Sequence, residues 1–167
     1  MFDEHYRDQV RAAAKVVNAR ITELSAEQSQ QVRAAVLQRF VDGSRIPSAG
    51  FSKRRTLESW PLWEALRGAA SVQAVDGWRW VSDFVGNSTV VLFFNEDEDR
   101  AMFRFADGAQ LVPVLEECTP FEFYLTNDNA EYLICFNHHD VLIGAGTAAL
   151  WLEQRSENRP STVAAGD

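Results

Sequence analysis

Four consecutive residues, Asn137-His138-His139-Asp140, are the part of this sequence best suited to chemistry. A histidine that is hydrogen-bonded to a carboxylate can act as a general acid or base, because the bond fixes the tautomer and raises the basicity of the ring. If the segment continued an extended strand, His138 and Asp140 would project from one side and His139 from the other. Adjacent histidines would then chelate a metal poorly, so we interpret Asn137 and Asp140 mainly as residues that shape a strand end. A small hydrolase or metal-dependent enzyme centred on His138, His139 and Asp140 is the alternative.

Complete signatures of catalysis or metal binding are missing elsewhere in the sequence. One further histidine, His5, is present, and the two cysteines, Cys118 and Cys135, are too far apart for a CxxC site. Structural zinc needs four ligands, and neither HExxH nor a complete EF-hand loop occurs. GxSxG and the phosphate-binding glycine motifs are also absent, so Gly144-Ala145-Gly146 is interpreted as a flexible entry into a helix. We therefore expect no catalytic residue, no metal and no cofactor.

Charge is distributed unevenly along the chain. The formal net charge is −8, and residues 83–140 contain twelve acidic residues but only Arg100 and Arg104 as basic ones. Nucleic-acid binding needs clustered positive charge, which the main body of this chain lacks. The acidic half suits a basic protein partner through electrostatic steering, whereas the alternative is that the excess acid serves solubility alone.

We expect such a partner to dock on an acidic, aromatic surface in the second half of the chain. The acidic segment 96–99 and the hairpin that ends at the two histidines supply its side chains. The predicted partner-binding residues are Glu96, Asp97, Glu98, Asp99, Glu122, Tyr124, Asp128, His138, His139 and Asp140. Most of the five tryptophans are expected in the core, and one left exposed beside the acidic strands would suit an interface anchor.

Size and composition indicate one cytoplasmic domain. A chain of 167 residues fits a single hydrophobic core. No apolar run approaches the roughly 20 residues that span a bilayer, and the polar start of the sequence is unlike a secretory signal. The low cysteine content fits a reducing compartment. Neither a nucleic acid nor a membrane is expected as a partner, and the choice between monomer and homodimer is open.

Hydrophobic periodicity predicts an α+β fold, namely an antiparallel sheet of about five strands with an N-terminal helical hairpin and further helices packed on one face. The hairpin is expected because two apolar stripes of helical spacing meet at Ser25, which has capping-box spacing to Gln28. The predicted domain, residues 1–155, divides into 1–42 (helical hairpin), 43–70 (loop and short helix), 75–143 (β-rich part) and 146–155 (last helix), followed by a flexible tail at 156–167. Strands are predicted at 78–83, 89–95, 101–105, 121–126 and 132–136, and a further helix at 111–118.

Alternation in the segment 121–126 assigns its side chains to two faces. Phe121, Phe123 and Leu125 share one face, and Glu122, Tyr124 and Thr126 share the other. The polar second set predicts a strand that is buried on one side only.

The end of the chain resembles a known class of protein. The segment Asn137-His138-His139-Asp140, followed by Val141-Leu142-Ile143-Gly144 and a helix that contains Trp151, is similar to small uncharacterised bacterial α+β proteins, some of which are toxin-immunity proteins. This resemblance covers the last third of the chain and carries no catalytic residue with it. It implies a stoichiometric inhibitor whose acidic surface covers the basic site of a toxin.

These observations favour a cytoplasmic protein-binding module of the immunity type. The first alternative is the enzyme described above. The second alternative is a structural subunit of a bacterial assembly.

Overall fold

A computed structural model describes residues 5–45 and 61–158, and its centre is one antiparallel sheet. Within the described residues the sheet has seven strands in the order β1-β4-β3-β5-β6-β7-β2. Their bounds are Ile21–Glu23 (β1), Ala70–Gln73 (β2), Val90–Phe93 (β3), Phe103–Phe105 (β4), Phe123–Thr126 (β5), Tyr132–Phe136 (β6) and Val141–Gly146 (β7).

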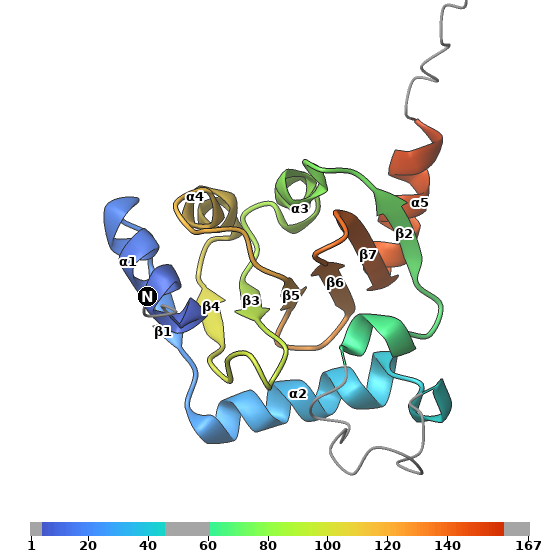
Figure 1. Cartoon of the computed structure of the whole chain (residues 1–167), viewed down its shortest axis with the longest axis horizontal. Coiled ribbons are helices and arrows are strands. Elements are labelled where there is room, and N and C mark those ends of the chain that lie inside the picture. The colour runs from blue at the N-terminus through green and yellow to red at the C-terminus, as the bar shows by residue number, and fades with distance from the viewer. Residues whose placement is uncertain (1–4, 46–60, 159–167) are drawn as a thin grey trace, which may run out of the picture.

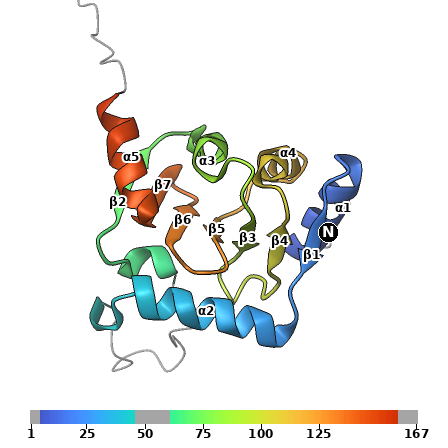
Figure 2. The same ribbon diagram turned by 180° about the vertical axis from the view of Figure 1, so that it is seen from behind.

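Helices cover both faces of this sheet, which therefore forms the middle of three layers (Figure 1). The α-helices are α1 (Tyr6–Val16), α2 (Ala26–Phe40), α3 (Gly77–Val85), α4 (Leu111–Glu116) and α5 (Thr147–Glu157). Three short 3₁₀ turns, η1 (Gly43–Arg45), η2 (Leu62–Ala65) and η3 (Gly108–Gln110), lie between them. Helices α1, α3, α4 and α5 lie on one face, and α2 lies on the other together with η2 (Figures 1 and 2).

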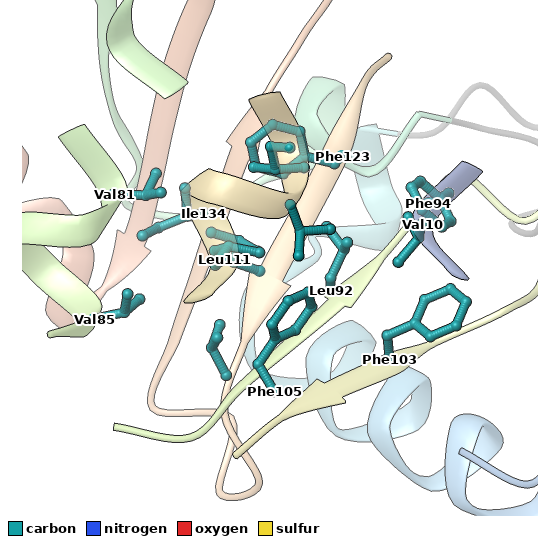
Figure 3. Close-up of a cluster of buried hydrophobic side chains, with 14 of the residues drawn as sticks. Val10, Val81, Val85, Leu92, Phe94, Phe103, Phe105, Leu111, Phe123 and Ile134 are labelled. Atoms are coloured by element: carbon teal, nitrogen blue, oxygen red, sulfur yellow. The ribbon is translucent and has the colours of Figure 1, made fainter. Parts of the chain in front are cut away.

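Two hydrophobic clusters, one on each face of the sheet, hold these layers together. Alternate residues of β3 enter different clusters: Val90 and Leu92 pack under the four-helix layer, whereas Val91 and Phe93 pack against α2 and η2. Figure 3 shows part of the first cluster, where residues from α1, α3 and α4 meet the sheet. Burial of apolar area contributes roughly 25 cal/mol per Å², so the largely aromatic and aliphatic strands account for most of the stabilisation.

The helix α3 corrects the prediction of a strand at 78–83. Alternation of Trp78 and Trp80 suggested a period of two, but the fully buried residues of this segment are Gly77, Val81 and Val85. Their spacing of four residues is that of one helix face. The tryptophans lie beside that face and are only half-buried, so aromatic content alone was misleading.

The predicted helical hairpin is also wrong, although its capping box is confirmed. Ser25 accepts a hydrogen bond from the backbone N–H of Gln28, and the Gln28 side chain accepts one from the N–H of Ser25. Between the two helices, however, β1 pairs with β4 and carries the chain across the edge of the sheet. Helices α1 and α2 consequently lie on opposite faces, and the expectation that all helices share one face fails.

The sheet has more strands than the predicted five because short segments complete it. It loses the predicted strand at 78–83 and gains β1, β2 and β7. The predicted hairpin at 121–136 is confirmed, with Tyr124 opposite Cys135, and so are the helix near 111–118 and the last helix. The alternation in β5 is confirmed too, but α2 and η2 cover its polar side, so the strand is buried on both faces. The predicted loop and short helix at 43–70 fall partly on residues 46–60, outside the described residues, and η2 occupies the position of the short helix. The tail predicted at 156–167 begins too early, because α5 extends to Glu157, and residues 159–167 lie outside the described residues.

Candidate functional site

Residues Asn137 to Asp140 form the tight turn between β6 and β7 and do not continue a strand. The backbone N–H of Asp140 donates to the carbonyl of Asn137 at 3.1 Å, and the N–H of Asn137 donates to the carbonyl of Val141 at 3.1 Å. The Asn137 side chain is buried, and its oxygen accepts from the N–H groups of His139 and Val141. Asp140 has φ of 57°, a left-handed conformation that Asp tolerates better than most residues. The interpretation of Asn137 and Asp140 as residues that shape a strand end therefore agrees with the structure. The opposite directions that an extended strand would give to His138 and His139 do not occur, because their ring centroids are 3.9 Å apart.

The carboxylate of Glu122 lies beneath this turn and organises it. Its side chain is 7% exposed, and both oxygens accept hydrogen bonds. Oε1 accepts from Trp63 Nε1 at 2.9 Å and from Asn95 Nδ2 at 2.7 Å. Oε2 accepts from the backbone N–H of His138 at 3.2 Å and lies 2.9 Å from its Nδ1. A buried carboxylate with this many donors is well compensated for its loss of hydration.

A second layer of hydrogen bonds fixes the groups that hold Glu122. The hydroxyl of Tyr124 donates to Asn95 Oδ1 at 2.8 Å, which determines the orientation of the Asn95 amide. Tyr124 is fully buried, and burial, followed by the charges of Cys135 and Glu122, raises its pKa well above the usual value. The hydroxyl thus stays protonated and remains a donor at neutral pH.

One ring nitrogen of His138, Nδ1, contacts Glu122, whereas the other, Nε2, is available to solvent. Because both oxygens of Glu122 accept hydrogen bonds from N–H groups, Nδ1 of His138 is assigned as the donor in this contact. The other nitrogen, Nε2, has no hydrogen-bond partner in the described part of the chain, and the side chain is 65% exposed. The Trp63 ring contacts both histidines edge-on, at centroid distances of 6.2 Å and 6.1 Å. A neutral His138 in this tautomer presents a lone pair to solvent and can accept a proton or a hydrogen bond.

The acidic segment 96–99 joins β3 to β4 next to the same turn, and its four carboxylates divide into two pairs. Glu96 lies between Arg33 and Arg100, and Asp99 accepts from the backbone N–H groups of Arg7 and Ala101. These two residues fix the loop. Asp97 and Glu98 are exposed instead.

The electrostatics of Glu98 link the loop to Glu122. Partial burial, followed by the negative charges of Glu122 and Asp97, raises the pKa of Glu98. Loss of hydration is the main cause of this raised pKa, and repulsion by the neighbouring carboxylates adds to it.

The structure brings most of the predicted partner-binding residues to one end of the sheet and separates one of them, Asp128. The register places the end of β3, the start of β5 and the turn after β6 at one end of the sheet. Asp128 lies in the β5–β6 turn at the opposite end, where it pairs with Arg104. Tyr124 is inside the core, and Glu122 is buried, so neither side chain offers surface to a partner. The exposed residues at the shared end, hereafter the acidic end, are Asp97, Glu98, His138, His139 and Asp140.

Two residues of the site, Trp63 and Asn95, were not predicted, whereas the predicted role of Asn137 in shaping the strand end agrees with its hydrogen bonds. Trp63 and Glu122 are 59 residues apart in the chain, and no spacing rule connects them. A weak signal exists for Asn95, since it is the first polar residue after the apolar run of β3.

The described residues contain no group of three or more His, Cys, Asp and Glu side chains arranged to hold a metal ion. Likewise, none of the helices within residues 5–45 and 61–158 has both the length and the apolar character to cross a membrane.

The sequence profile of a family of unknown function, DUF6756, matches residues 6–155 of the 167. The chain belongs to this family. The matched region contains every residue of the Glu122 network and of the acidic end. Curated proteins and solved structures gave no significant match.

Proposed function

We propose that this protein is a protein-binding module of the immunity type, a stoichiometric inhibitor that covers the basic surface of a toxin with its acidic end. The observation that carries the proposal is that the exposed residues Asp97, Glu98, His138, His139 and Asp140 all lie in loops at one end of the sheet, where hydrogen bonds to Glu122 and Asn137 hold the β6–β7 turn. We infer a cytoplasmic setting because Cys118 and Cys135 are both free thiols.

Binding of a basic partner would be favoured because it relieves the repulsion between the carboxylates of the acidic end. Carboxylates that repel one another in the free protein gain most when a partner supplies positive charge, and such complementarity also accelerates association. Hydrogen bonds to Glu122 and Asn137 preorganise the turn, which lowers the entropy cost of docking.

The test uses the proteins encoded by the genes that flank this one, each purified and measured for binding to the chain by calorimetry. We expect one of them to bind, with affinity that falls about tenfold between low and moderate salt. Glu98→Lys should weaken binding by about tenfold or more. Glu153→Lys, an exposed position on α5 with the same charge change, should leave it within about twofold.

Two outcomes contradict this proposal. One is that no flanking gene product binds. The other is that binding is indifferent both to salt and to Glu98→Lys.

A second candidate function, acid–base chemistry at His138, is favoured by the Glu122–His138 contact of 2.9 Å. The carboxylate partner is Glu122, whereas the sequence suggested Asp140. If His138 acts as a general base on small esters, His138→Gln should lower p-nitrophenyl acetate hydrolysis by about tenfold or more. His139→Gln, which removes the neighbouring ring but not the Glu122 contact, is the matched control. Equal rates for both variants exclude this function, and a stoichiometric metal lost on His138→Ala would favour its metal-dependent form.

A further inference from the structure

An aromatic pocket lies beside the acidic end, on the face of the sheet covered by α3 and α4. Its volume is about 350 Å³, and its lining includes Val75, Trp78, Phe121, Phe123, Phe136 and Asp140. Ligand sites in proteins have volumes of roughly 300–1,000 Å³, so this pocket matches a single large side chain or ring and is too small for a dinucleotide.

The fold builds the pocket from three directions. Phe123 and Phe136 are paired across β5 and β6, and their ring centroids are 6.2 Å apart. Trp78 comes from the first turn of α3, and Phe121 comes from the segment after α4. On the rim, Val75 is 74% exposed, which extends the apolar surface outward.

The charges around the pocket leave one carboxylate free. Arg79 forms an ion pair with Glu116 between α3 and α4, and its guanidinium lies 4.5 Å from the centroid of the Trp78 ring. These two charges offset each other. Asp140 is exposed, and its carboxylate has no hydrogen bond or ion pair with any described residue. An aromatic wall beside one free negative charge is complementary to an apolar group that is joined to a cation.

We propose that this pocket receives an aromatic or long aliphatic side chain of the basic partner protein, and that a neighbouring arginine or lysine of the partner pairs with Asp140. The inference rests on the proposed function and names the anchor of that interface. Asp140 belongs both to the pocket and to the acidic end, so the two surfaces are continuous and one partner can cover both.

The first experiment measures binding of the partner identified among the flanking gene products. Val75→Arg places a bulky cation at the mouth of the pocket and should weaken binding by about tenfold or more. Val16→Arg, at an equally exposed valine on α1, is the matched control and should change binding by less than about twofold. Asp140→Asn, which keeps a residue that tolerates the left-handed backbone, should weaken binding by about fivefold or more. Equal affinities for the Val75→Arg and Val16→Arg variants would overturn the proposal while leaving the proposed function intact.

The second experiment needs no partner, and it uses Cys118 as a reporter inside the pocket. Cys118 lines the pocket, and burial, then the charge of Glu117, raises the pKa of its thiol to about 11. Cys135 is fully buried, so alkylation of the folded chain by iodoacetamide at pH 9 reports on Cys118. Benzamidine, which joins a ring to a cation, should slow the reaction more than neutral benzamide at the same concentration.

Asp140→Asn should abolish the difference between the two compounds. Equal protection by both compounds in the wild-type chain, or a difference that survives Asp140→Asn, would contradict the assigned chemistry. Micromolar affinity for benzamidine, combined with partner binding that ignores Val75→Arg, would assign the pocket to a free small molecule and reject a protein side chain. If no flanking gene product binds, the proposed function fails, and this second experiment still tests the pocket.

Discussion

At the scale of single residues, Glu122 links segments that are far apart in the chain. Its four donors come from η2, from the loop after β3 and from the β6–β7 turn. A buried carboxylate is stabilising only while such donors are present, because each unpaired donor left behind carries its own desolvation penalty. The network therefore makes the position of His138 depend on a residue 16 positions earlier.

Replacing Glu122 by glutamine tests this dependence. The new amide group would face N–H donors with an N–H₂ of its own, so we expect the free energy of unfolding to fall by about 1–3 kcal/mol. Urea unfolding at pH 7 measures the change. Glu131→Gln, an exposed position that bonds Asn127, should change it by less than about 0.5 kcal/mol. A loss no larger than that of the control would show that the network does not hold the turn.

Replacing Glu98 by glutamine should increase stability, in contrast to the same replacement at Glu122, because the charge of Glu98 is unfavourable in the free protein. Its pKa is raised in the folded state, so the folded chain is penalised above that pKa and the penalty disappears as the pH falls through it. Glu98→Gln should therefore increase stability at pH 7, by at most about 0.5 kcal/mol because solvent screens an exposed carboxylate. The gain should vanish near pH 4, and thermal unfolding at both pH values measures it. A variant that is less stable than wild type at pH 7 would contradict the repulsion.

At the residue scale, the sequence indicated which residues form the β6–β7 turn but not which residues contact them. Asn137 to Asp140 were recognised from their types, and the acidic segment from its charge. The enzyme alternative considered a bond between a histidine and Asp140, whereas the carboxylate that contacts His138 in the structure is that of Glu122. Contacts between segments tens of residues apart depend on strand register, which a single sequence does not contain.

At the scale of elements, the junction between β7 and α5 requires a glycine at position 146. Gly144-Ala145-Gly146 was interpreted as a flexible entry, but these residues belong to β7. Gly146 has φ of 64°, and a Cβ there would lie 2.4 Å from the carbonyl oxygen of Glu131. The glycine thus lets the chain turn sharply from strand to helix against the neighbouring strand.

Gly146→Ala should reduce the free energy of unfolding by about 3 kcal/mol, because both the backbone conformation and the space are incompatible with a methyl group. Gly43→Ala is the matched control, since a Cβ at that position meets nothing within 4 Å. We expect the control to change stability by less than about 0.5 kcal/mol. Chemical denaturation of both variants measures the difference, and equal values would contradict the crowding at Gly146.

Elements with strong local patterns were predicted well, and short ones were not. The helix that begins after Ser25 and the hairpin at 121–136 carry capping and alternation signals of their own. The three residues of β1 have no such signal and become a strand only because β4 is available beside them. In α3, the alternate positions of two tryptophans gave the pattern of a strand. The buried residues are instead Gly77, Val81 and Val85, which have helical spacing.

At the scale of the whole molecule, the buried acids of the core respond together to alkaline pH. Burial raises the pKa of Tyr124, Tyr132 and Cys135, and that of Cys118 to about 11. Each group is neutral when protonated, and the unfolded chain releases these protons first. Stability should therefore be lost as the pH rises above about 9, where ordinary thiols ionise.

Cys118→Ala isolates one part of this response. Removing the thiol should reduce the loss of unfolding free energy between pH 7.5 and pH 10 by about 1 kcal/mol, after allowance for the partial exposure of the side chain. Urea unfolding under reducing conditions at both pH values measures the change. A wild-type chain that is equally stable at pH 7.5 and pH 10 would contradict the prediction.

The place of β1 at the edge of the sheet has a consequence for biosynthesis. Its hydrogen-bonding partner β4 leaves the ribosome about 80 residues later, which is roughly 4–16 s at about 5–20 residues per second. In this interval α1 and α2 are complete, whereas β4, β5 and β6, which contribute residues to the same two clusters, have not been made. We expect the apolar sides of these helices to be accessible to chaperones during this time. The N-terminal quarter of the chain should therefore fold only after the central strands have been synthesised.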